Sequence, residues 1–276
     1  MNKSLLFWML AFLITAGSAV YQRVTGPTYA LSGKCTLDGK DIPYKFDRAH
    51  PGETNHTVKI ETNDESISGY VEWKRFKTQD EYTKVPMSFG NSMLSAELPH
   101  QPPAGKLEYK VTLQKENNLI TIPENKPVVI RFRGDVPLLI LIVHVLAMFI
   151  GMLLATRAGL ESLSKQPQLK NLIYWTIGSL TVGGLILGPV VQWYSFGAFW
   201  TGWPIGKDLT DNKTALIVLM WVIAAVMLKR SKNSKRWALA AAIITLIVYL
   251  IPHSVLGSEI DYSKTEKQNV SFLMNR

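Results

Sequence analysis

Two histidines stand out because each lies in or directly after an apolar run, where an ionisable side chain is costly and marks a functional site by default. His144 lies inside an apolar run, eight residues after its first residue, Val136. His253 follows a run that ends at Ile251. At helical spacing, each histidine shares one stripe with other side chains: His144 with Met148 and Met152, and His253 with Tyr249 and Thr245. A neutral imidazole can ligate a metal or the iron of heme. The pattern predicts that His144 and His253 are metal ligands, with hydrogen bonds to neighbouring helices as the alternative.

The loop between two later apolar runs is rich in aromatic residues. Six of the sixteen residues from Trp193 to Asp208 are aromatic, and glycines are interspersed among them. Because glycines let rings approach a flat ligand closely, the loop predicts a cofactor platform formed by Phe199, Trp200 and Trp203. The alternative is an aromatic belt at the level of the lipid headgroups.

The residues of this loop and of the segment after it carry a family resemblance. They read Phe196-Gly197-Ala198-Phe199-Trp200, then Trp203 and Asp208, then Lys213-Thr214-Ala215-Leu216-Ile217 and Trp221. Together with the glycine-rich stretch 183–188, this order is similar to the tryptophan-rich loop of the cytochrome c assembly family, so the region from about Leu138 to Gly257 resembles these heme-handling membrane proteins. The resemblance implies heme as the cofactor and His144 and His253 as its axial ligands. It also implies heme contacts from Phe199, Trp200, Trp203 and Asp208.

Apolar runs must position these residues. They span 136–155, 172–193, 215–228 and 237–251, and an earlier run covers 5–20. The later four predict a bundle of four transmembrane helices, although the last two runs are shorter than the ~20 residues of a full span. The first run predicts an uncleaved N-terminal anchor, with a signal peptide cleaved near Ala16-Gly17-Ser18-Ala19 as the alternative. Asp211 or Asn212 can cap the helix that follows the aromatic loop.

The charged residues indicate an orientation in the membrane. The formal net charge is +9, and a net +8 of it comes from Lys3 and the segments 157–170 and 229–236, which flank apolar runs. Because basic loops stay in the cytoplasm, these segments are predicted inside, and the aromatic loop, residues 22–135 and the tail outside. The chain is therefore expected in an inner or plasma membrane with the lipid bilayer as partner. Nucleic acid is not expected as a partner, because helix-flanking segments account for the basic residues.

Residues 22–135 are polar and predict a β domain outside the cytoplasm. Runs at 58–61, 66–76, 106–113 and 128–132 have strand character, and Asp38-Gly39 is a hairpin turn. About seven short strands fit this length, which predicts an immunoglobulin-like β-sandwich. Cys35 is the only cysteine, so no intrachain disulfide can form, and a buried, inert thiol is expected.

The predicted fold is α+β, with an anchor helix at 1–21, a β-sandwich at 22–135, a four-helix bundle at 136–257 and an extracytoplasmic tail at 258–276. The predicted function is that of a heme-handling protein, like those of cytochrome c biogenesis, that holds heme at the outer leaflet. The alternative is a non-catalytic membrane anchor whose β-sandwich binds an extracytoplasmic protein partner. A transporter is disfavoured, because no Asp, Glu, Lys or Arg lies deep in the four later runs. The sequence assigns no enzymatic activity, since it contains no Ser-His-Asp pattern, zinc spacing or phosphate-binding glycine loop.

Overall fold

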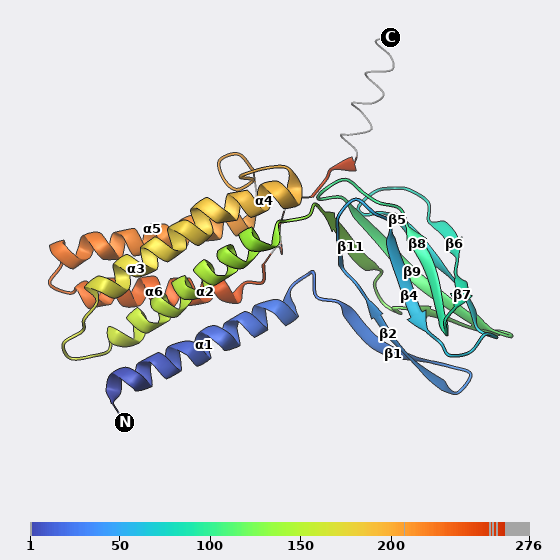
Figure 1. Ribbon diagram of the computed structural model, residues 1–276, viewed down its shortest axis with the longest axis horizontal. Helices are drawn as coiled ribbons and strands as arrows, with labels where there is room; N and C mark the ends of the chain where they lie inside the picture. The colour runs from blue at the N-terminus through green and yellow to red at the C-terminus, as the bar shows by residue number, and fades with distance from the viewer. Residues whose placement is uncertain (1, 207, 254, 256, 258, 263–276) are drawn as a thin grey trace, which may run out of the picture. The chain divides into compact units, whose positions relative to one another are not determined.

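The computed structural model describes residues 2–206, 208–253, 255, 257 and 259–262 (Figure 1). The chain divides into two compact units: a helical bundle from residues 1–27 and 136–258, and a β unit from residues 28–135 and 259–276. The N-terminal helix α1 (Lys3–Thr25) belongs to the bundle. The predicted domain boundary at residue 22 falls inside this helix, because the helix continues through Thr25 before Gly26 ends it.

The β unit contains more and shorter strands than the seven predicted. They are β1 (Leu31–Leu37), β2 (Lys40–Phe46), β3 (Ala49–Pro51), β4 (His56–Glu61), β5 (Ser68–Arg75), β6 (Thr83–Pro86), β7 (Ser88–Gly90), β8 (Met93–Leu98), β9 (Lys106–Lys115), β10 (Asn118–Ile122) and β11 (Val128–Arg133). The predicted hairpin turn is confirmed, because Asp38 and Gly39 join β1 to β2 with φ of 51° and 75°. Both values lie in the left-handed region that a tight two-residue turn requires.

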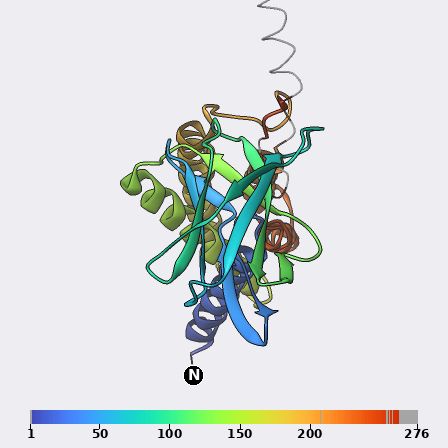
Figure 2. The same cartoon turned by 90° about the vertical axis from the view of Figure 1, so that its right-hand side faces the viewer.

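Three sheets of the β unit share one apolar core. The largest sheet has the order β3-β11-β9-β5-β6, with β10 also paired to β9, and two smaller sheets are β1-β2 and β4-β8-β7. Figure 2 shows the strands of the β unit facing the viewer. Along β9 the side chains of Leu107, Tyr109 and Val111 are fully buried and those between them are partly exposed, as the predicted alternation requires. Side chains from every sheet enter the core, including Ile42, Leu94 and Phe132.

The short segment after the last helix packs against the β unit. The Glu259 carboxylate accepts hydrogen bonds from the Lys77 ammonium at 2.7 Å and from the Lys106 ammonium at 2.6 Å. The Tyr262 hydroxyl accepts one from the Lys106 backbone N–H at 3.0 Å and donates one to the Gln101 side-chain oxygen at 3.0 Å. Residues 259–262 are therefore part of the β unit, whereas the rest of the predicted tail, 263–276, lies outside the described residues.

The bundle contains long apolar helices. After α1 come α2 (Leu138–Glu161), α3 (Lys170–Leu180), the π-helical segment η1 (Thr181–Leu187), α4 (Gly188–Phe196), α5 (Leu209–Arg230) and α6 (Ser234–Leu250). Among the described residues, four helices are long and apolar enough to cross a membrane: α1, α2, the continuous helix 170–196 and α5. Helix α5 is longer than its apolar run, because the polar residues 209–214 are also helical. Helix α6 is short, as predicted, at 17 residues and thus about 25 Å.

A π-helical turn interrupts the helix 170–196, and the sequence explains its position. Pro189 has no backbone N–H, so it cannot donate to the carbonyl one α-helical turn earlier, and the ladder adjusts in the residues before it. The Gly188 N–H instead bonds to the Gly183 carbonyl, five residues back. A methyl group added at Gly183 would lie only 3.0 Å from the Ala147 methyl, so these glycines allow η1 to approach α2 closely. Such π-turns are frequent at functional sites.

Candidate functional site

The two predicted histidine stripes face each other in the bundle. The Tyr249 hydroxyl on α6 donates a hydrogen bond to the Met148 carbonyl on α2 at 3.2 Å. Deeper in the same stripes, Met152 and Thr245 are buried, with 2% and 1% of their surface exposed. Met152 and Thr245 thus turn toward the protein interior, whereas His144 is half-buried and His253 is exposed.

Both histidines lie at the same end of these two helices. A methyl group added at Gly159 on α2 would lie 2.7 Å from the Ala242 methyl on α6, whereas Met148 contacts Tyr249. The contact partner of Ala242 is residue 159 of α2, and that of Tyr249 is residue 148. The chain therefore runs in opposite directions along α2 and α6, and the two helices are antiparallel. His144 comes one turn before Met148, and His253 comes four residues after Tyr249. This end, where α2 begins and α4 and α6 finish, is called the loop end below.

His144 has a defined orientation. Its Nδ1 atom lies 2.9 Å from the carbonyl oxygen of Gly183 in the π-helical turn. A carbonyl only accepts hydrogen bonds, so Nδ1 carries the proton and Nε2 carries the lone pair in the neutral ring. Metal-ligating histidines commonly donate their second N–H to a backbone carbonyl in this way, which fixes the ring and leaves the other nitrogen for the metal. The alternative prediction for His144, a hydrogen bond to a neighbouring helix, is confirmed. Such a bond is compatible with metal ligation through Nε2, which stays a prediction.

His253 lies in the exposed turn that follows α6. Two side chains that the sequence analysis did not single out fix the backbone just before it. The Lys213 ammonium donates to the carbonyls of Ile251 and Pro252 at 3.2 and 3.4 Å, and the Gln22 side-chain amide donates to the Tyr249 carbonyl at 2.9 Å. A cation bonded to carbonyls at a helix C-terminus is a stabilising arrangement. Sequence signals for this role were weak, because Lys213 lies 38 residues from its acceptor.

The aromatic loop is held together by contacts among its own rings. Trp193 and Phe199 stack at 4.6 Å between ring centroids and an interplanar angle of 10°. The Trp200 indole N–H donates to the Trp203 carbonyl at 3.2 Å. Trp203 and Phe199 remain exposed over 77% and 54% of their surfaces, and Ile205 over 77%. Of the predicted platform, Phe199 therefore pairs with Trp193, and Trp203 presents its ring outward.

Asp208 and Asp211 have structural roles that differ from those predicted. Asp208 is the N-cap of α5, because its side chain accepts the Thr210 N–H at 2.8 Å. The expectation that Asp211 or Asn212 caps this helix is wrong, because the helix starts one turn earlier. Buried Asp211 instead accepts the backbone N–H groups of Thr201 and Gly202 at 2.7 and 2.9 Å and so fixes the aromatic loop to α5.

The histidines of the β unit form a contact that the sequence did not predict. His50 and His56 approach with 3.3 Å between their Nδ1 atoms and an edge-to-face arrangement of their rings, and His50 also contacts the Phe132 ring edge-to-face. His56 lies in the polar segment 22–135, yet only 7% of it is exposed. Burial, and secondarily the neighbouring His50, lowers the pKa of His56 to about 4. Among the described residues no group of three His, Cys, Asp or Glu side chains converges on a common point that could hold a metal ion.

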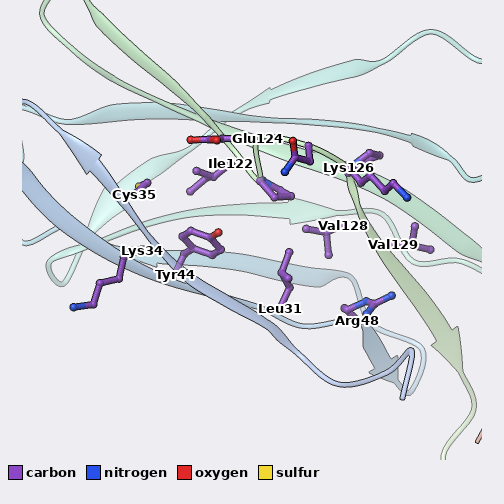
Figure 3. A pocket seen from close by; sticks show the side chains of 13 residues that line it. Leu31, Lys34, Cys35, Tyr44, Arg48, Ile122, Glu124, Lys126, Val128 and Val129 are labelled. Atoms are coloured by element: carbon purple, nitrogen blue, oxygen red, sulfur yellow. The ribbon is translucent and has the colours of Figure 1, made fainter. Parts of the chain in front are cut away.

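The β unit also contains a groove of about 650 Å³ between the β1–β2 hairpin and the connection from β10 to β11 (Figure 3). Apolar walls come from Leu31, Ile122 and Val128, and Tyr44 lies across the groove. The charged lining residues are Lys34, Arg48, Glu124 and Lys126. Cys35 also lines it, and burial raises the pKa of this thiol, so it stays protonated at neutral pH. The expectation of a buried cysteine is confirmed.

Comparisons of the chain with protein-family models, with curated proteins and with solved structures find no match. What the chain binds must therefore be inferred from its own residues.

Proposed function

We propose that this chain is a multi-pass membrane protein that holds heme at the loop end of its helical bundle. The observation that carries the proposal is the hydrogen bond from His144 Nδ1 to the Gly183 carbonyl, which leaves the Nε2 lone pair for an iron atom. The family resemblance of the aromatic loop agrees with this ligand. In this proposal the chain binds heme for transfer to an acceptor or for electron transfer.

The donor set fits heme better than a bare metal ion. A protein-bound zinc ion needs three or four side-chain ligands, and the described residues do not gather them. Heme brings its own four nitrogen ligands and needs only one or two axial ligands from the protein. His144 would supply the first, and His253 is the candidate for the second, because it follows the contact between Tyr249 and Met148 at the same end. When bound, heme supplies an iron that takes up and releases one electron.

The aromatic loop would cover the edge of this site. Asp211 holds the loop on α5, so Trp203 and Phe199 keep their positions at the loop end without help from a ligand. Their exposed faces suit either the porphyrin edge or the lipid headgroups. In the proposed topology the loop end lies outside the cytoplasm, because the basic residues flank the opposite ends of the helices.

Absorption spectra of the purified full-length protein, supplied with heme, test the proposal. The parent protein should give a Soret band, and His144→Leu should abolish it while circular dichroism and gel filtration remain unchanged. Met152→Leu is the matched control, because it changes the same stripe two turns away from the ligand. Trp200→Ala should weaken heme binding without abolishing it, since one ring contributes only part of the affinity. A parent protein that stays colourless would overturn the heme proposal.

Reporter fusions test the topology separately. A reporter that is active only outside the cytoplasm should be active after Asp208 and silent after Lys232, because the segment 229–236 is strongly basic. The opposite pattern would place the loop end in the cytoplasm and would contradict the orientation.

A second candidate function is supported by the groove of the β unit. We propose that this unit is an immunoglobulin-like sandwich that binds an acidic segment of an extracytoplasmic protein. Three cations against one carboxylate line the groove, which favours an acidic partner. A photo-crosslinking residue at Lys126, inside the groove, should yield a discrete adduct in cells, whereas one at Lys59, exposed on β4, should not. Equal adducts from both positions would indicate nonspecific contact and would contradict this function.

A further inference from the structure

A second groove lies in the bundle, at the end opposite the loop end. It has a volume of about 390 Å³, and its walls come from α3 and α5, which pack against each other. The lining residues are Tyr174, Ile177, Val222, Ala225, Val226, Lys229 and Arg230. On α5 these positions follow the spacing of one helical face, so the groove runs along the helix axis.

The groove is apolar along its length and cationic at its end. Its α5 wall begins with Val222 and Val226, both more than 40% exposed, and finishes at the exposed Lys229 and Arg230. Lys170, at the start of α3, lies one turn before Tyr174 and adds a cation at the same end. The basic residues of the following turn, 232–236, are also nearby in the chain. The charge therefore changes along the groove as it does along a phospholipid, from uncharged chain to charged headgroup.

We propose that this groove binds an anionic phospholipid of the leaflet that contacts the basic end of the bundle. One acyl chain lies between α3 and α5 along Ile177, Ala225 and Val226, and the phosphate meets Lys229 and Arg230. Basic pockets between membrane helices recognise anionic headgroups in this way. The size argues against a helix of a second chain as the occupant, because a helix with its side chains is about 10–12 Å across. Zwitterionic lipids lack the net negative charge that two cations select.

Among the residues that the structure describes, no carboxylate forms an ion pair with Lys229 or Arg230. The carboxylate nearest in sequence at this end of the bundle is Glu161, and it is held by Arg157 at 2.7 Å. It also accepts the Gln168 backbone N–H at 3.2 Å, so its oxygens are both engaged. The charge at the groove end is therefore available to a lipid phosphate.

Native mass spectrometry of the full-length protein, in detergent with equal amounts of phosphatidylglycerol and phosphatidylcholine, tests the proposal. The parent should retain phosphatidylglycerol preferentially, and Lys229→Gln with Arg230→Gln should reduce this preference by about fivefold for each cation removed. The matched control is Lys235→Gln with Arg236→Gln, which removes the same charge from the first turn of α6, outside the groove lining, and should keep the preference. The exchanges Lys229→Arg and Arg230→Lys should also keep it.

A third variant separates the groove from the charge. Ala225→Trp fills the groove and leaves every cation in place, so it should release phosphatidylglycerol although the net charge is unchanged. The proposal is overturned if the parent shows no preference for phosphatidylglycerol, or if the control pair lowers this preference as much as the groove pair does. It is also overturned if Ala225→Trp retains phosphatidylglycerol as the parent does. A change of oligomeric state in Ala225→Trp, measured by light scattering, would show that the groove receives a second copy and would also overturn it.

Discussion

The cores of the two units are built from different side chains. In the β unit the fully buried residues include large ones, such as Phe46, Tyr109 and Phe132. Among the described residues of the bundle, six of the thirteen in the buried core are alanines: Ala155, Ala158, Ala224, Ala238, Ala241 and Ala242. In water, removing large apolar surfaces from solvent drives folding. Lipid is as apolar as leucine, so membrane helices gain instead from close backbone approach between small residues. The composition of each core thus agrees with a water-facing β unit and a lipid-facing bundle.

The two units also differ in the partners of their buried polar groups. In the bundle, the hydroxyls of Thr176 and Thr245 bond to carbonyls one turn earlier in their own helices, at 2.7 Å each. Thr245 also accepts the indole N–H of the fully buried Trp221 at 2.8 Å. In the β unit, buried His56 contacts another ionisable ring, His50. These two hydroxyls of the bundle therefore have neutral partners, whereas the β unit buries a histidine that titrates beside a second histidine.

The largest effect is expected from truncating the core of the β unit. Residues 28–135 contain a core of their own and should fold when expressed without the helices. Phe132→Ala should lower the free energy of unfolding by about 3–5 kcal/mol, because a fully buried ring leaves a cavity. Urea unfolding followed by circular dichroism measures this. Leu119→Ala, at a residue that is 59% exposed, is the control and should change little. Equal losses for both variants would contradict the assigned core.

A pH effect on stability is expected in the β unit. The pKa of His56 is about 4 in the folded state and near 6.5 when unfolded, so the unfolded state binds the proton more tightly. The stability that His56 contributes is therefore complete above pH 6.5 and is lost as the pH falls toward 4, by at most about 3 kcal/mol. Thermal unfolding of the isolated β unit across this range measures the loss. His56→Gln should make the stability of the β unit less dependent on pH. An unchanged slope of stability against pH would show that other groups cause the loss.

Overpacking should matter most in the bundle. Gly159→Leu should destabilise the protein in detergent by about 1–3 kcal/mol, because even its first carbon would lie 2.7 Å from the Ala242 methyl. Gly178→Leu is the matched control, since nothing lies within 4 Å of a carbon added there. Titration of both variants with dodecyl sulfate measures the difference. If Gly178→Leu were the more harmful, the close contact between α2 and α6 would be in error.

The smallest effect is expected from one interhelical hydrogen bond. Thr245→Val keeps the shape of the side chain and removes the acceptor of the Trp221 N–H, which should cost about 0.6–2 kcal/mol. Thr176→Val is the control, because among the described residues the Thr176 hydroxyl bonds only to a carbonyl of its own helix. The same titration compares them, and a shifted Trp221 fluorescence should accompany Thr245→Val alone.

The local pattern of residues sufficed to predict the parts of this protein that depend on nearby positions. Apolar runs predicted the helices, period-two alternation predicted β9, and Asp38-Gly39 predicted the hairpin, because each signal lies within a few residues. Five strands were missed: β3, β6, β7, β8 and β10. The first three have only three or four residues, which carry too little periodicity. The stripes that contain His144 and His253 were also readable, because helical spacing alone puts residues four apart on one face.

The tertiary structure decided what those side chains contact. The Gly183 carbonyl that orients His144 is 39 residues away in the chain, and it is accessible because Pro189 induces a π-helical turn. Asp211 became the anchor of the aromatic loop once α5 began at Leu209, with Asp208 as its cap. Such pairings depend on how whole helices pack and where they start. Because α5 starts at Leu209, Asp208 caps the helix and Asp211 is left to bind the loop. Local sequence preferences cannot specify that start, because each of the candidate caps satisfies them.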